Sequence, residues 1–168
     1  MTALLVLGAC GRGGASNASA TPPPPGVATV VEVVDGDTVR VRFPGQSATE
    51  SVRLIGIDTP ETRGPGGLRE CFGAQASART AALLPRGSQV RLERDVEARD
   101  RYARLLAYVY RKRDGLFVNL ALARDGFAAP LSIPPNVAYA ADFTAAAAAA
   151  RDADLGLWGR CGGPDTPL

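Results

Sequence analysis

The chain has 168 residues, of which 46% are apolar and 21% charged, and its formal net charge is +2. This length and composition fit one ordinary globular domain with a real core, and so small a charge does not by itself indicate a nucleic-acid binder. The sequence contains no histidine, so acid–base or metal chemistry must use carboxylates, arginine and backbone oxygen, and oxygen ligands favour Ca²⁺ or Mg²⁺ over zinc or copper.

Residues 1–10 are expected to be a lipoprotein-type signal segment. Their apolar run ends in Leu7-Gly8-Ala9-Cys10, which resembles a bacterial lipobox, so Cys10 would carry lipid and anchor the protein to a membrane. The run is short and no basic residue precedes it, so an ordinary signal remnant or a chance apolar end is the alternative. Residues 11–26 are rich in Gly, Ser, Ala and Pro and predict a linker. We therefore expect an exported protein, either a cell-envelope lipoprotein or extracellular, with a folded domain over residues 27–168.

The folded domain begins with strand-like sequence. Valine-rich or alternating segments predict strands over residues 27–34, 38–43 and 50–57, and Asp35-Gly36 is a tight-turn signal between the first two. An alanine-rich helix is expected over 72–84, followed by strands at 89–93 and 104–110 and helices at 118–124 and 136–155. This order predicts an α+β fold, a five-stranded OB-type β-barrel with three helices. No large apolar pattern is left over, so we expect a monomer.

Two cysteines, Cys71 and Cys161, lie in the folded domain. Export would permit a disulfide between them, joining the end of the chain to its middle. Two buried free thiols are the alternative.

The chemistry-bearing residues fall in two short runs. Residues 34–38 and 53–61 contain four carboxylates and an arginine, namely Asp35, Asp37, Asp58, Glu61 and Arg53. Carboxylates crowded together repel one another unless a cation neutralises them, and the adjacent guanidinium suits a phosphate ester. A plain hairpin turn is the alternative for Asp35-Gly36-Asp37 taken alone, but the nearby carboxylates favour a site.

Several blocks in order resemble the staphylococcal nuclease (thermonuclease) family over about residues 27–160. The matching blocks are Asp35–Thr38, Arg53–Glu61, Glu70–Gly73, Asp100–Tyr110, Val118-Asn119 and Gly156–Trp158. The resemblance implies a Ca²⁺-dependent nuclease that hydrolyses the phosphodiester bonds of DNA and RNA. The alternative is a non-catalytic OB-fold module that binds nucleic acid, in which we would expect some of these positions to be lost.

The resemblance also implies a role for each site residue. Asp37, Asp58 and the Thr59 carbonyl would hold the metal, while Asp35 would orient metal-bound water. Glu61 would activate or position the attacking water. The two arginines that would bind the phosphodiester and stabilise its transition state are Arg53 and Arg104, and those contacting the terminal phosphate and sugar are Arg101 and Tyr102.

Two departures from the family pattern are visible. Residues 129–133, Ala-Pro-Leu-Ser-Ile, stand where the type member has tyrosines beside the nucleotide base, so base stacking is expected to be lost there. Ala103 replaces a glycine just before Arg104.

Overall fold

The computed structural model describes residues 26–63, 67 and 69–167. The proposed signal segment, Cys10 and the linker up to residue 25 therefore lie outside the described residues. Within those ranges, no helix combines the length and the apolarity that crossing a bilayer requires.

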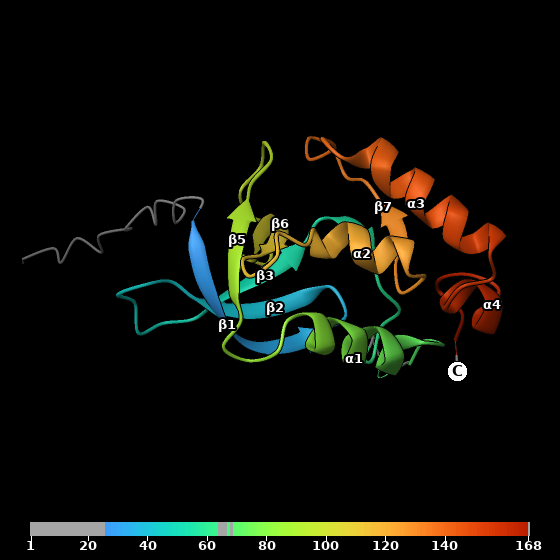
Figure 1. The fold of residues 1–168 in the computed structure, drawn as a ribbon, viewed down its shortest axis with the longest axis horizontal. Coiled ribbons are helices and arrows are strands. Elements are labelled where there is room, and N and C mark those ends of the chain that lie inside the picture. The colour runs from blue at the N-terminus through green and yellow to red at the C-terminus, as the bar shows by residue number, and fades with distance from the viewer. Residues whose placement is uncertain (1–25, 64–66, 68, 168) are drawn as a thin grey trace, which may run out of the picture.

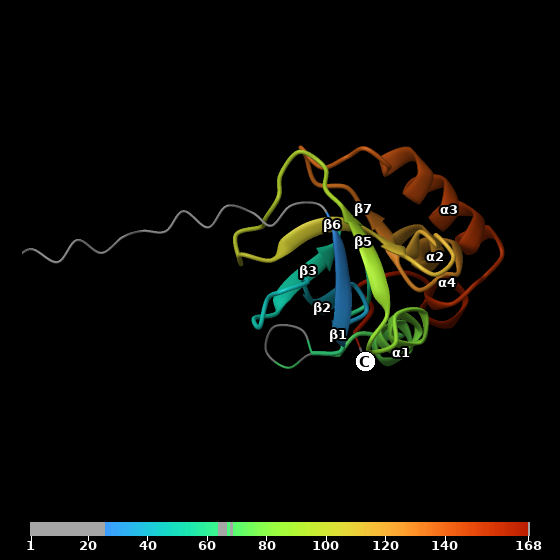
Figure 2. The ribbon, with the colours of Figure 1, turned by 60° about the vertical axis from the view of Figure 1, so that its left-hand side comes forward.

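Five strands of the described chain close into a barrel in the order β1–β2–β3–β6–β5 (Figure 1). They are β1 (Val27–Asp35), β2 (Thr38–Arg42), β3 (Glu50–Leu54), β5 (Gln89–Glu93) and β6 (Leu105–Arg111). Figure 2 shows β1 and β5 side by side, which is the antiparallel pairing that closes the barrel. Only β3 and β6 pair in parallel among the barrel strands. This topology confirms the predicted OB-type α+β fold.

The barrel interior is filled by alternate residues of the strands, as the sequence pattern predicted. Val39 and Val41 of β2 and Val52 and Leu54 of β3 are fully buried. The intervening residues of β2 face outward, because successive side chains of a strand point to opposite sides. The same alternation places Arg53, between Val52 and Leu54, outside the barrel core.

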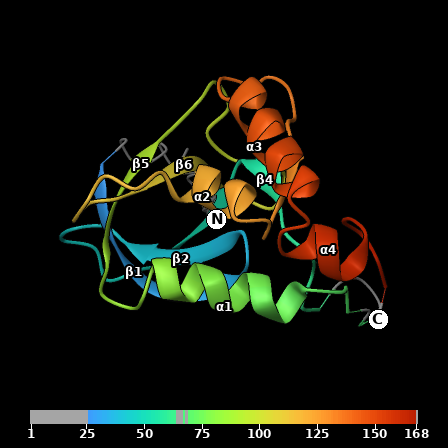
Figure 3. The same ribbon diagram turned by 45° about the vertical axis from the view of Figure 1, so that its right-hand side comes forward.

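The helices cover one side and the lower end of the barrel. Helix α1 (Gly73–Leu83) runs below β1 and β2, whereas α2 (Val118–Arg124) lies between the barrel and α3 (Ala140–Asp152) (Figures 1 and 3). A fourth, short helix, α4 (Leu157–Cys161), follows α3. The sequence did not predict α4, because five residues are too few to show a helical period.

The predicted third strand is broken into two. After β3 the chain turns at Gly56, whose φ is +84°, and continues as β4 (Gly56–Asp58), which pairs with β7 (Ala129–Leu131) in a separate two-stranded sheet. A side chain at Gly56 would meet the ring of Phe143 on α3, with its Cβ 2.1 Å from Cε2. Glycine is therefore required by a residue almost 90 positions away, and the break places Asp58 on β4, outside the barrel sheet.

The predicted helix over 136–155 begins later, at Ala140, and ends at Asp152. Asn136 lies before it, buried, with its side-chain oxygen 2.8 Å from the Glu97 amide and its side-chain nitrogen 3.1 Å from the Glu97 carbonyl. An asparagine that satisfies another segment's backbone competes with helix formation. Helix α3, which contains the alanine run, therefore begins only after Asn136.

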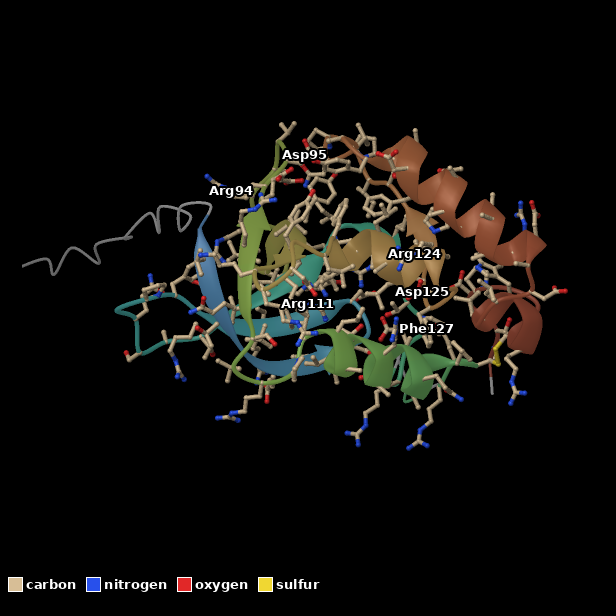
Figure 4. All side chains as sticks on the ribbon, in the orientation of Figure 1. Arg94, Asp95, Arg111, Arg124, Asp125 and Phe127 are labelled. Carbon is tan, nitrogen blue, oxygen red and sulfur yellow. A yellow bond between two sulfur atoms is a disulfide. The ribbon has the colours of Figure 1, made fainter. Side chains whose placement is uncertain are left out.

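Contacts at the middle and at the C-terminal end of α1 fix it against the rest of the fold. Figure 4 shows Asp125 and Phe127, which follow α2, above α1, and Arg111 near its C-terminal end. Arg79 of α1 pairs with Asp125 at 2.6 Å and lies over the ring of Phe127. Arg111 donates to the Leu83 carbonyl at 2.8 Å. Helix α1 is therefore held against both the segment after α2 and the end of β6.

The predicted Cys71–Cys161 pairing is present as a disulfide, with the two Cα atoms 6.0 Å apart (yellow bond beside α4 in Figure 4). It joins the residues just before α1 to the end of α4. The Cys71 amide also donates to the Thr166 carbonyl at 2.7 Å, so the C-terminal segment is tied to the same point twice.

Candidate active site

Asp37 lies buried where the β1–β2 turn meets the segment after β4. Its Oδ2 accepts from the Thr59 amide at 3.0 Å and from the Thr59 hydroxyl at 3.1 Å. The neighbouring Gly36 permits this approach, because a Cβ there would lie 2.5 Å from Thr59 Oγ1. Burial raises the pKa of Asp37, while Arg53 and the Thr59 amide act in the opposite direction. The turn is therefore more than a hairpin, since it is locked onto a second segment.

Arg53 joins two of the predicted metal ligands. It lies on β3 opposite Thr38 of β2. Its Nη1 pairs with Asp37, and its Nη2 lies 2.6 Å from Asp58 Oδ1 and 3.0 Å from the Ile57 carbonyl. Burial lowers the pKa of Arg53, but the Asp37 and Asp58 carboxylates outweigh it and hold that pKa above its ordinary value. Asp37 and Asp58 therefore meet at one guanidinium.

Glu61 lies close to Asp35 and Asp37. Burial, a side-chain hydrogen bond with Asp35 and the charges of both aspartates raise the pKa of Glu61 to about 7. Its backbone is held by Glu70, whose Oε2 accepts from the Glu61 amide at 2.8 Å and whose amide donates to the Glu61 carbonyl at 3.0 Å. No role for Glu70 was predicted from the sequence, although it lies in one of the matching blocks. Glu70 positions the segment that carries Glu61.

Arg104, just before β6, is held by Asp100. Its Nε lies 2.6 Å from Asp100 Oδ2, and its amide donates to Asp100 Oδ1 at 2.9 Å. Burial alone would raise the pKa of Asp100. The hydrogen bonds from Arg104 lower it by more, so the pKa lies below its ordinary value. Arg104 Nη1 also approaches Thr38 Oγ1 at 3.4 Å, and that hydroxyl donates to Asp37. This chain of contacts brings Arg104 to the same side of the barrel as Arg53.

Six of the predicted site residues border one cavity of about 590 Å³, which we call the central cavity, whereas Asp35, Asp37 and Thr59 are not part of its lining. Its lining includes Arg53, Asp58, Glu61, Arg101, Tyr102, Arg104, Leu131 and Ile133. At its edge the exposed ring of Tyr102 carries the guanidinium groups of Arg101 and Arg104 at 4.8 and 5.5 Å from its centre. The wall contributed by Leu131 and Ile133 is aliphatic, in keeping with the expected loss of base stacking.

The donor set suits a hard cation held by few protein ligands. Asp35, Asp37, Asp58 and Glu61 supply only oxygen, and the pKa of Glu61 is raised by burial first and then by the hydrogen bond and charges of Asp35 and Asp37. In the part of the chain that the structure describes, no three acidic or cysteine side chains converge tightly enough to form a metal site by themselves. Two carboxylates completed by backbone and water oxygens are chemically reasonable for Ca²⁺ or Mg²⁺, both of which accept water ligands.

Comparisons with known proteins give one consistent result. Residues 51–160 match the family model described as staphylococcal nuclease homologue. The chain is 41% identical over 131 residues to a thermonuclease of Staphylococcus intermedius, which covers 78% of this chain and 75% of that protein. It is 36% identical over 136 residues to endonuclease YncB and 37% identical over 136 residues to the SPbeta prophage-derived endonuclease YokF, both of Bacillus subtilis. Each match covers 80% of this chain, but 62% of YncB and 44% of YokF.

Proposed function

Because the chain belongs to the staphylococcal nuclease family, we propose that it is a nuclease that hydrolyses phosphodiester bonds in DNA and RNA. The observation that carries the proposal is the meeting of Arg53, Asp58, Glu61 and Arg104 around one cavity, with Asp37 bound to Arg53. Guanidinium groups match phosphate oxygens, and carboxylates beside them can take up a proton or a cation. The names of the relatives, thermonuclease and endonuclease, support the same activity.

The proposed cofactor is Ca²⁺, held by Asp37, Asp58 and the Thr59 carbonyl, with Asp35 orienting a metal-bound water. When bound, the cation would polarise the phosphate and neutralise charge on its oxygens. Asp37 and Asp58, which both pair with Arg53 in this structure, would supply carboxylate oxygens to the cation. Thr59 is fixed for this role by its two hydrogen bonds to Asp37.

The chain's own residues would carry the remaining steps. Ionised Glu61 would position the attacking water and accept its proton, and burial together with Asp35 raises its pKa to about 7, which suits a proton acceptor near neutral pH. Arg53 and Arg104 would stabilise the charge that builds on the non-bridging oxygens. In-line attack at phosphorus would release the 5′ oxygen and leave a 3′-phosphate. Arg101 and Tyr102 would contact the terminal phosphate and sugar of the bound strand.

We further propose that the protein is exported, with Cys10 as a lipid anchor, and works as a monomer. The Cys71–Cys161 disulfide supports export, because such bonds persist in oxidising compartments. The proposed lipidation of Cys10 is supported by the sequence motif alone.

A cleavage assay tests the activity. Purified full-length protein is incubated with single-stranded DNA or RNA, with Ca²⁺ or with a chelator, and the products are separated by size. We expect calcium-dependent degradation, and about a hundredfold or greater loss of rate for Arg104→Lys, because a lysine cannot reproduce the two-pronged contact. Arg86→Lys, an exposed arginine outside the central cavity, is the matched control. Full activity of Arg104→Lys would falsify its role, and retarded but intact DNA would support the binding module instead.

A further inference from the structure

A second cavity, of about 770 Å³, adjoins the central cavity. Its lining includes Glu61, Arg63, Arg69, Glu70, Cys71 and Arg160. Glu61 lines both cavities, so the two meet at the residue proposed to position the attacking water. We call this second space the arginine cavity.

The charge of the arginine cavity favours an anion. Its three arginines, Arg63, Arg69 and Arg160, are exposed, and none of them forms an ion pair with any residue that the structure describes. Most other arginines of the described chain do pair with a carboxylate. The lining also contains two acidic groups, so its three arginines outnumber them; Glu70 accepts the Glu61 amide and Glu61 lies against Asp35.

The arrangement is held together by the disulfide. Arg69 comes two residues before Cys71 and Arg160 one residue before Cys161, so the Cys71–Cys161 bond brings two arginines from distant segments to the same cavity. The Cys71 amide and the Thr166 carbonyl reinforce this junction at 2.7 Å. Charged groups held in place before binding cost less ordering when a ligand arrives.

We propose that the arginine cavity binds the phosphodiester backbone of the substrate strand, on the opposite side of the scissile bond from the nucleotide at Arg101 and Tyr102. The inference rests on the proposed nuclease function and extends it. Two features carry it. The cavity shares Glu61 with the active site, and its guanidinium groups, which pair with no carboxylate among the described residues, are complementary to phosphates. A strand crossing Glu61 would then meet arginines on both flanks.

The test uses single-stranded DNA oligonucleotides that contain one cleavable phosphodiester. Neutral methylphosphonates replace the linkages on the 5′ flank in one substrate and on the 3′ flank in the other. The variant is Arg69→Ala/Arg160→Ala in the full-length protein, and Arg86→Ala is the control that removes an exposed arginine elsewhere. We expect the double variant to lose about tenfold or more in kcat/KM on only one of the substrates, the one whose charged flank lies in the arginine cavity.

Arg101→Ala should show its loss on the other substrate, because it acts on the opposite flank. The slope of log affinity against log salt concentration should also become smaller in magnitude by about 1.4 in the double variant. Each lost phosphate contact to a single strand accounts for about 0.7 of this change. Equal loss on both substrates, no loss, or loss on the same flank as Arg101→Ala would overturn the proposal.

A failure of the nuclease function itself would be recognised separately. If the wild type cleaves neither substrate, fluorescence anisotropy with the same labelled oligonucleotides, in chelator, still measures binding. Weaker binding of the double variant to one flank-charged substrate alone would then support the arginine cavity without catalysis. Unchanged binding would contradict it.

Discussion

Removing the Cys71–Cys161 disulfide should lower the free energy of unfolding by about 4 to 5 kcal/mol. The bond joins residues 90 positions apart. Closing a loop of that length removes about 15 cal/mol/K of entropy from the unfolded chain, which is about 4.6 kcal/mol at room temperature. If the free energy of unfolding falls by about 2 kcal/mol for each molar of urea, the unfolding midpoint of Cys71→Ser/Cys161→Ser should fall by about 2 M.

The assay is urea unfolding followed by the fluorescence of the only tryptophan, Trp158, and by circular dichroism. Trp158 lies on α4 beside Cys161, so the two probes separate local loosening of α4 from global unfolding. Cys10→Ser is the control, because it makes the same chemical change without touching the pair. A double variant that unfolds at the wild-type urea concentration would refute the reasoning.

Three further changes test other parts of the account by urea unfolding. Asn119→Ala should cost about 2 to 5 kcal/mol, because it leaves a buried β6 amide and the Ile55 carbonyl without their hydrogen bonds at 2.9 Å; a loss below 1 kcal/mol, on the order of a surface change, would contradict this. Ala103→Gly should stabilise by about 0.5 to 1 kcal/mol, because Ala103 has a φ of +63°, and destabilisation would argue against strain. Arg104 lowers the pKa of Asp100. Ionised Asp100 therefore stabilises the folded state above about pH 4, and this stabilisation is lost as pH falls through the folded-state pKa. The stability gap to Asp100→Asn should therefore narrow in acid, and a gap independent of pH would count against the pairing.

The barrel and the family could be predicted because their signals are local. Alternation along residues 38–43 specifies which side of β2 faces the core, and Val39 and Val41 are buried as expected. The blocks around Asp37 and Arg53 identified the family, which the comparisons confirm. Each of these signals is contained within a few adjacent residues.

The features that escaped prediction depend on contacts between distant segments. The glycine at the Gly56 break is required by Phe143, and the late start of α3 follows from the bonding of Asn136 to Glu97. The pattern of nearby residues contains neither partner. The local sequence pattern alone therefore predicts a longer strand over residues 50–57 and a longer helix over residues 136–155.

Contacts between distant segments also limited what could be predicted for the site. Asp37, Asp58 and Arg53 were expected together, and the structure brings them together. The positioning carboxylates Glu70 and Asp100 were missed, because each acts on another residue's backbone or side chain and carries no signature of its own. Their importance becomes visible only when the Glu61 amide and the Arg104 guanidinium are placed beside them.

The central claim is that one cluster of carboxylates and arginine serves both a cation and a phosphodiester. Its most direct test is the calcium dependence of DNA cleavage by the wild type and by Asp58→Asn. Asp58 is the suitable proposed ligand to change, because it is partly exposed and because Arg53 would keep its pairing with Asp37. We predict no cleavage in chelator, saturation of the wild type with Ca²⁺, and about tenfold or more Ca²⁺ needed by the variant, since affinity follows the number of charged ligands. Wild-type cleavage that persists in chelator, or identical calcium curves for the two proteins, would contradict the account.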